Sequence, residues 1–275
     1  MKKTIIISTD MEGLTGISRW SQVTPTSPDY AEGCAALRHD LRVVLDVLEG
    51  QGYDLVVVDG HWTGTNLQPG DVGTATLMSG TRMPWGMVEQ VQHHGVVGLI
   101  LLGYHGCAGS GGAMAHTWDT VFTAVHIDGQ LAGEITLATN LARQCAVPLL
   151  GVSGDDWACR EARQIAGSKV PTAEVKQSRS YESVAHHSPE QADKALQAMA
   201  QQALELAATS SAGFRAPIGP KTTQEIVAKF SSHVGADRAA LVPGTERLDA
   251  LTLKYTDTPK ASFDALRSWA MLADV

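Results

Sequence analysis

The chain has 275 residues, of which 44% are hydrophobic and 18% charged, enough for one large domain or two smaller ones whose core needs no disulfide. Its 21 Lys and Arg against 29 Asp and Glu give a formal net charge of -8, which argues against a nucleic-acid-binding protein because such a protein needs a basic surface. Ten histidines in so acidic a chain make metal chemistry the first possibility to test.

The strand and helix patterns alternate along the chain, which is typical of an α/β fold with a largely parallel sheet. Up to about residue 155, strands are predicted at 4–9, 55–58, 96–102, 121–127 and 148–152, and helices at 28–48 and 133–145. Beyond it, helices are predicted from 155, at 189–208 and from 259, and strands at 173–176, 225–230 and 250–255. The Ser-, Gly- and Pro-rich segment 210–223 is interpreted as a connection.

The change in pattern near residue 155 predicts two domains. We expect the domain of residues 1–155 to carry the largely parallel sheet, flanked by helices, and residues 156–275 to form a second, smaller α/β domain.

The N-terminus and the cysteines predict a cytoplasmic protein. The apolar run Ile5–Ile7 is too short for the core of a signal peptide or for a membrane span. The four cysteines are widely spaced and include no C-x-x-C pair, so we interpret them as free thiols in a reducing compartment. Cys107 lies in a glycine-rich loop and is a candidate nucleophile, but a packed small side chain is the favoured interpretation.

Acidic residues and histidines follow the ends of three predicted strands. In open α/β sheets ligands bind beyond the carboxyl ends of the strands, so these positions are the candidates for a functional site. After the three strands come, in order, Asp10 with Glu12, His61, and His105, while Glu134 begins a predicted helix and His116 lies in a glycine-rich loop.

Asp10 and Glu12 are two residues apart, so in an extended segment their side chains point the same way. Two unpaired carboxylates in one cleft would repel, and one would have to bind a proton unless a cation were shared between them. Carboxylates combined with imidazoles suit Zn²⁺, and a dinuclear site needs a bridging carboxylate, for which Asp10 is best placed. Taken singly, an Asp after a strand is usually a turn or cap residue and a His is more often structural. Their combination at one edge predicts a metal site.

Ser8-x-Asp10-x-Glu12-Gly13 resembles the motif of the D-aminopeptidase family of dinuclear zinc metallopeptidases. The resemblance continues in the same order over essentially the whole chain, through Asp59-Gly60-His61, Gly103-Tyr104-His105, Met114-Ala115-His116, Gly133-Glu134, Gly154-Asp155-Asp156, Val175-Lys176-Gln177 and Pro243-Gly244-Thr245-Glu246. Eight motifs in register make the resemblance specific.

The resemblance implies two zinc ions per subunit. One would be held by Asp10, Glu12 and His61, and the other by Asp10, His105 and Glu134, with Asp10 bridging. His116 corresponds to the family's catalytic histidine, which is not a metal ligand. The resemblance also implies that the metal domain comes first in the chain and that ten subunits form a ring around a central channel.

The activity that follows is hydrolysis of short peptides or amino-acid amides at a free amino terminus by metal-activated water. The resemblance does not decide whether a D-amino acid is required. The chain departs from the family pattern at Gly60, and Trp62, Trp85 and Trp118 flank motif positions, so substrate preference stays open.

Two other functions are compatible with these residues. A dinuclear metal phosphoesterase also uses Asp and His at strand ends, but the motif loops contain no Lys, and the nearest arginines, Arg19 and Arg82, lie outside them. A non-catalytic protein could use the same cleft to bind a small ligand. The presence of all five predicted ligands and of His116 argues against this second alternative.

Overall fold

The computed structural model describes residues 3–210 and 221–274, so most of the predicted connection at 210–223 lies outside the described residues. The strands are β1 (Lys3–Thr9), β2 (Tyr53–Asp59), β3 (Thr76–Met78), β4 (Val96–Tyr104), β5 (Phe122–Ile127), β6 (Gln130–Leu131), β7 (Leu149–Asp155), β8 (Thr172–Ser180), β9 (Ser183–His186), β10 (Gln224–Phe230), β11 (Glu246–Arg247) and β12 (Thr252–Asp257). The α-helices are α1 (Tyr30–Leu48), α2 (Glu134–Gln144), α3 (Asp156–Ala166), α4 (Pro189–Ser210), α5 (His233–Ala239) and α6 (Pro259–Ala273). Short 3-10 helices lie at Trp20–Gln22, Pro69–Asp71 and Gly86–Val88.

The larger sheet has the strand order β3-β2-β1-β4-β7-β8-β9 and is parallel except at β9, which pairs antiparallel with β8. This confirms the predicted α/β class. The chain runs outward from β1 to β2 and β3, then returns to place β4 on the other side of β1. Such a reversal is the point at which open α/β sheets form a ligand crevice.

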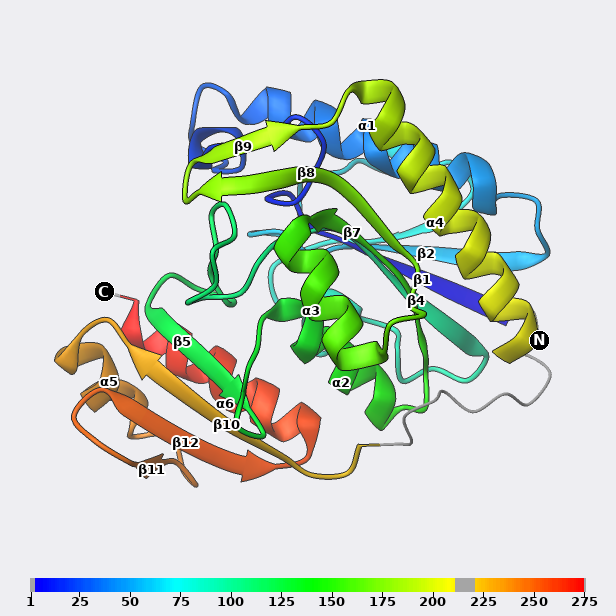
Figure 1. The fold of residues 1–275 in the computed structure, drawn as a ribbon. Coiled ribbons are helices and arrows are strands. Elements are labelled where there is room, and N and C mark those ends of the chain that lie inside the picture. Colours follow the sequence, from blue (N-terminus) through cyan, green and yellow to red (C-terminus); the bar gives the residue numbers. More distant parts are fainter. Residues whose placement is uncertain (1–2, 211–220, 275) are drawn as a thin grey trace.

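The two faces of the larger sheet are covered by different helices (Figure 1). Because side chains alternate along a strand, Ile5 and Ile7 pack on the face covered by α1 and α4. Ile6 points to the opposite face, where α2, α3, α6 and the smaller sheet complete the core. All three isoleucines are fully buried, which explains why β1 appears in the sequence as a continuous apolar run.

The smaller sheet is antiparallel, with the strand order β11-β12-β10-β5-β6. Two strands of this smaller sheet, β5 and β6, precede residue 155, and its other strands follow that residue. Conversely, β8 and β9 follow residue 155 but belong to the larger sheet. The two sheets are therefore interleaved along the chain. The division into residues 1–155 and 156–275 remains a prediction.

Most predicted elements differ from the observed ones by one to four residues at their ends. The helix expected from Pro28 begins at Tyr30, because the preceding residues form a turn closed by the Tyr30 N–H and the Ser27 carbonyl. The short strands β3, β6, β9 and β11 and the seven-residue α5 were not predicted, since two to seven residues carry too little periodicity. None of the described helices is long and apolar enough to cross a membrane.

A buried lysine connects the larger sheet to the loop that follows β1. Lys176 in β8 is fully buried, and its ammonium donates hydrogen bonds to the carbonyls of Glu12 (2.6 Å), Leu14 (3.0 Å) and Ile17 (2.6 Å). Buried Asp40 in α1 accepts from the Thr15 N–H of the same loop at 2.9 Å. One cation thus satisfies three buried carbonyls that no regular ladder could pair.

Replacing this cation should destabilise the protein. In Lys176→Met the carbonyls of Glu12 and Ile17 lose their donor, while that of Leu14 keeps the Ile17 N–H at 3.3 Å. A buried unsatisfied group costs roughly 1–3 kcal/mol, so we expect the free energy of unfolding to fall by about 2 kcal/mol or more. The exposed Lys169 provides the control, because Lys169→Met should change it by less than about 0.5 kcal/mol. Urea denaturation of both variants tests this, and equal stability of Lys176→Met and wild type would contradict it.

Candidate metal centre

The predicted ligands converge where β1 lies between β2 and β4. Asp10 and Glu12 are in the loop after β1, and the Asp10 N–H is held by the Leu102 carbonyl of β4 at 2.8 Å. Gly13 ends this loop segment against β4, where a Cβ would lie 1.7 Å from the Tyr104 carbonyl oxygen. Only glycine therefore allows the loop to approach β4 so closely.

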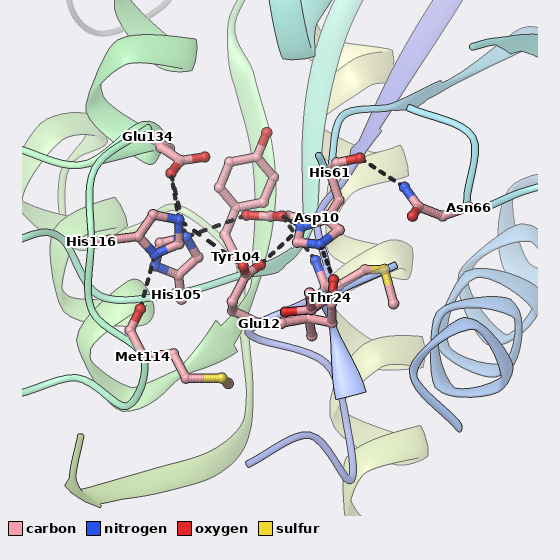
Figure 2. A network of polar contacts seen from close by, with 12 residues as sticks. Asp10, Glu12, Thr24, His61, Asn66, Tyr104, His105, Met114, His116 and Glu134 are labelled. Carbon is pink, nitrogen blue, oxygen red and sulfur yellow. Dashed lines mark hydrogen bonds and ion pairs between the residues drawn. The ribbon is translucent and has the colours of Figure 1, made fainter. Parts of the chain in front are cut away.

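Asp10 lies between two groups of potential ligands (Figure 2). Its Oδ1 is 3.0 Å from His61 Nδ1, and its Oδ2 is 3.4 Å from His105 Nε2. In the first group, one ligand atom from each of Asp10, Glu12 and His61 lies within 4.8 Å of the others; the second group joins His105, His116 and Glu134 by the same measure. The structure thus brings all six predicted site residues together.

The orientations of the three histidines suit metal coordination. His61 donates from Nε2 to the Val23 carbonyl at 2.7 Å, which leaves Nδ1 facing Asp10 and Glu12. His105 and His116 donate from Nδ1 to the carbonyls of Gly106 and Met114, both at 2.9 Å, which leaves Nε2 facing the carboxylates. A backbone carbonyl that holds one ring nitrogen of a histidine and frees the other is the usual support of a metal-ligating imidazole.

Three buried polar atoms in these groups lack a hydrogen-bond partner among the described residues: Asp10 Oδ2, Glu12 Oε2 and His105 Nε2. They lie within 3.2–3.4 Å of an oppositely charged group, but without hydrogen-bond geometry. A buried carboxylate oxygen without a donor is costly, and a divalent cation would satisfy it. The donor set of carboxylate oxygens and imidazole nitrogens fits Zn²⁺.

In the protein without metal, burial and the neighbouring charges shift the pKa values of the predicted ligands. Burial, together with the charge of Glu12, raises the pKa of Asp10 to about 7. Burial opposes the charged form of Glu12 as well, but the charges of His61, His105 and His116 hold its pKa well below its usual value. Burial also opposes the charged forms of His61 and His105, yet the surrounding carboxylates raise the pKa of both well above the usual value. These acids and bases can all be charged together only by neutralising one another.

Glu134 reaches the site from the first residue of α2. Its Oε1 accepts a hydrogen bond from the Trp118 N–H at 2.8 Å and lies 3.5 Å from His105 Nε2 and 3.6 Å from His116 Nε2. The start of α2 is held in turn by Glu161 of α3, whose buried Oε1 accepts from the N–H groups of Gly133 (2.7 Å) and Thr136 (3.0 Å). The sequence pattern gave no signal for Glu161, because it acts from a different helix.

His116 is placed differently from the predicted zinc ligands. Its ring stacks on that of His105, with centroids 4.2 Å apart and planes 6° from parallel. Its side chain is 12% exposed, against 2% for His105. Burial and the neighbouring charge of His105 lower the pKa of His116, which favours its neutral form. The geometry groups His116 with His105 and Glu134, whereas the family resemblance assigned Asp10 to that set and kept His116 apart.

A cavity of about 160 Å³ opens onto both ligand groups, and it is lined by Trp62 and Trp118, which flank the motifs, and by Arg267 of α6. Arg267 lies more than 130 residues beyond the nearest predicted ligand, so the sequence pattern gives no signal for it, unlike the two tryptophans. Cys107 is buried, and burial raises the pKa of its thiol to about 12, which supports packing rather than nucleophilic chemistry.

Comparisons with known proteins identify the family of this chain. A family model described as D-aminopeptidase matches residues 1–267. A D-aminopeptidase of Bacillus subtilis (strain 168) is 30% identical over 244 residues, which span 88% of this chain and 86% of that protein. The solved structure of the Zn-dependent D-aminopeptidase DppA from Bacillus subtilis, described as a self-compartmentalizing protease, has a TM-score of 0.89 at 27% identity and covers 98% of this chain and 97% of its own. This chain belongs to the D-aminopeptidase family.

Proposed function

We propose that the protein is a zinc-dependent aminopeptidase that hydrolyses short peptides or amino-acid amides at a free amino terminus. The observation that carries this proposal is the pair of ligand groups joined through Asp10 below one cavity, with unpartnered buried oxygen and nitrogen atoms in both groups. Membership of the D-aminopeptidase family supports it, and the comparisons do not favour a phosphoesterase or a non-catalytic binding protein.

Two zinc ions per subunit would be held by this chain. Asp10, Glu12 and His61 would hold one, and Asp10, His105 and Glu134 the other, with Asp10 bridging. Such a pair supplies an activated water nucleophile and polarises the scissile carbonyl. The protein's own contribution is to hold each ligand in place, through carbonyls of the backbone for the histidines and through the Trp118 N–H for Glu134.

His116 is proposed as the catalytic proton carrier. Its Nδ1 is fixed by the Met114 carbonyl, so Nε2 is the atom that faces the site, 3.6 Å from Glu134 Oε1. Its lowered pKa keeps Nε2 free to accept a proton, which it would pass to the leaving amine. His105 beneath it limits its rotation through the stacked contact.

The proposal extends to the stereochemistry of the substrate's amino-terminal residue. The curated relative and the solved structure are both described as D-aminopeptidases, and we propose the same stereochemical preference here. Trp62 and Trp118 line the cavity, so they are placed to restrict the shape of a bound side chain.

We propose that ten subunits assemble into a ring in the cytoplasm. The described self-compartmentalization of the related structure supports a closed assembly, and all four cysteines are free, as expected in a reducing compartment. Within the described residues, five of the eight exposed large hydrophobic side chains belong to the segment Val234–Leu272, and burying them in subunit contacts would be favourable.

The proposed role of His116 in proton transfer can be tested by substitution. In His116→Ala, kcat for D- and L-aminoacyl nitroanilides should fall by roughly 10²–10⁴ because the proton carrier is lost, while zinc stays near two per subunit by elemental analysis. Nitrophenyl phosphate is the control substrate and should not be hydrolysed. Full activity would refute the role of His116, and loss of one zinc would make it a ligand instead.

The stability of the metal-free protein should depend on pH. Without metal, the raised pKa values of Asp10, His61 and His105 mean that the folded protein binds more protons than the unfolded chain above about pH 6.5. Stability of the chelator-treated protein should therefore fall as the pH rises from about 6.5 to about 8. The zinc-loaded protein should not lose stability over this range, because metal binding requires deprotonated ligands. Urea denaturation of both forms measures this, and a metal-free protein that gains stability would contradict it.

The proposed ring can be tested by the mass of the assembled protein. Native mass spectrometry of the purified protein should give a species of ten times the 29.2 kDa subunit mass. Placing a charge on the exposed Met271, as in Met271→Asp, should shift the mass towards smaller species because a buried unpaired charge is costly. A monomeric wild-type protein would exclude the ring.

A further inference from the structure

The cavity above the ligand groups contains one fixed positive charge. Its lining includes the carboxylates Asp10, Glu12 and Glu134, and Arg267 is the only Lys or Arg among the described residues that line it. Arg267 comes from α6, which packs against α2, β10 and β12, so it reaches the cavity from a part of the chain that supplies no predicted metal ligand.

The guanidinium of Arg267 is held by aromatic rings and by backbone carbonyls. Its guanidinium carbon lies 5.7 Å from the centre of the Trp118 ring and 5.4 Å from that of Phe263. Its Nη1 donates to the carbonyls of Met83 (3.1 Å) and Pro84 (3.4 Å). A guanidinium fixed in this way loses little freedom when it binds a second partner.

The charge of Arg267 is poorly neutralised. Its side chain is only 19% exposed, and the nearest carboxylate, Asp264, is 4.0 Å from Nη1 and is already bound by Lys260 at 2.5 Å. Among residues 3–210 and 221–274, no group accepts a hydrogen bond from its Nε or Nη2. Two donors of a mostly buried guanidinium are therefore available to an anion, the kind of partner for which the planar fork of arginine is suited.

Arg267 is connected to the metal ligands through a single residue. Trp118 holds Glu134 with its backbone N–H at 2.8 Å, and the ring of the same tryptophan lies against Arg267. A substrate whose scissile bond lies at the ligand groups would have its leaving group within the same small cavity as this guanidinium.

We propose that Arg267 binds the free α-carboxylate of the substrate's leaving group and is the residue that makes the enzyme prefer a peptide with a free carboxyl terminus over the corresponding amide. This inference rests on the proposed aminopeptidase function and adds a specificity-determining residue to it. Such a peptide is a zwitterion, and its two charges match a cavity that has carboxylates at one part of its lining and a guanidinium at another.

The experiment compares a dipeptide with its carboxyl-terminal amide, using D-alanyl-D-alanine and D-alanyl-D-alanine amide on the zinc-loaded enzyme. Wild type should prefer the dipeptide in kcat/KM by roughly 10–100-fold, the effect of a charged hydrogen bond. Arg267→Met keeps an apolar stem against Trp118 and should remove this preference by raising KM for the dipeptide, with little change for the amide. Arg267→Lys, which keeps the charge but loses the fork, should lie between the two.

Arg160→Met is the matched control, because Arg160 also lies over a tryptophan, 4.6 Å from the Trp157 ring centre, but does not line the cavity. It should leave both substrates unaffected. An equal loss for dipeptide and amide in Arg267→Met would show a structural role and overturn the inference, as would equal kcat/KM in wild type.

Binding measured without turnover separates this inference from the proposed function. Calorimetry should show the dipeptide binding to wild type more tightly than its amide, and the difference should disappear in Arg267→Met. If neither compound is hydrolysed, the proposed function fails, and the calorimetric comparison still decides on Arg267. Equal binding of the two compounds by wild type would overturn the inference even if both are hydrolysed.

Discussion

The structure depends on keeping three carboxylates and three imidazoles together in a buried place. Asp10, Glu12 and Glu134 are each at most 7% exposed and face His61, His105 and His116 over distances of 3.0–4.0 Å. In water such groups would separate and be hydrated, and burial makes the charged form of each one unfavourable by itself. The carboxylates stabilise the charged forms of His61 and His105, and the atoms left without hydrogen-bond partners are the ones that a metal pair would satisfy.

The surrounding backbone makes this arrangement possible. Carbonyl groups of Val23, Gly106 and Met114 each take one ring N–H of a histidine, so every imidazole presents its other nitrogen to the carboxylates. Lys176 and Glu161 perform the corresponding task for the two segments that carry Glu12 and Glu134: the first binds carbonyls of a loop, and the second binds N–H groups at the start of a helix. The ligands are therefore positioned by groups from different strands and helices.

Charge is unevenly distributed in the cavity, and the proposed role of Arg267 in substrate choice rests on this distribution. Carboxylates predominate around the ligand groups, whereas Arg267 brings a positive charge from α6, a helix that packs with the smaller sheet. The motif loops contain no lysine or arginine for a phosphate, but Arg267 supplies a cation to the cavity from outside them. Peptide hydrolysis is therefore favoured over phosphate chemistry by membership of the D-aminopeptidase family.

The sequence by itself determined the α/β class, the longer strands and helices, and the six residues of the candidate centre. Buried parallel strands appear as apolar runs, and Asp10, Glu12, His61 and His105 follow such runs, which places them at the sheet edge. Glu134 and His116 do not directly follow a strand, and the family resemblance assigned their roles. Which residues support the ligands was decided by the tertiary structure. Lys176, Glu161 and Arg267 act across large sequence separations, through contacts that no local period records. The interleaving of the two sheets had the same origin, since pairing of β5 with β10 depends on long-range packing rather than on the pattern within either strand.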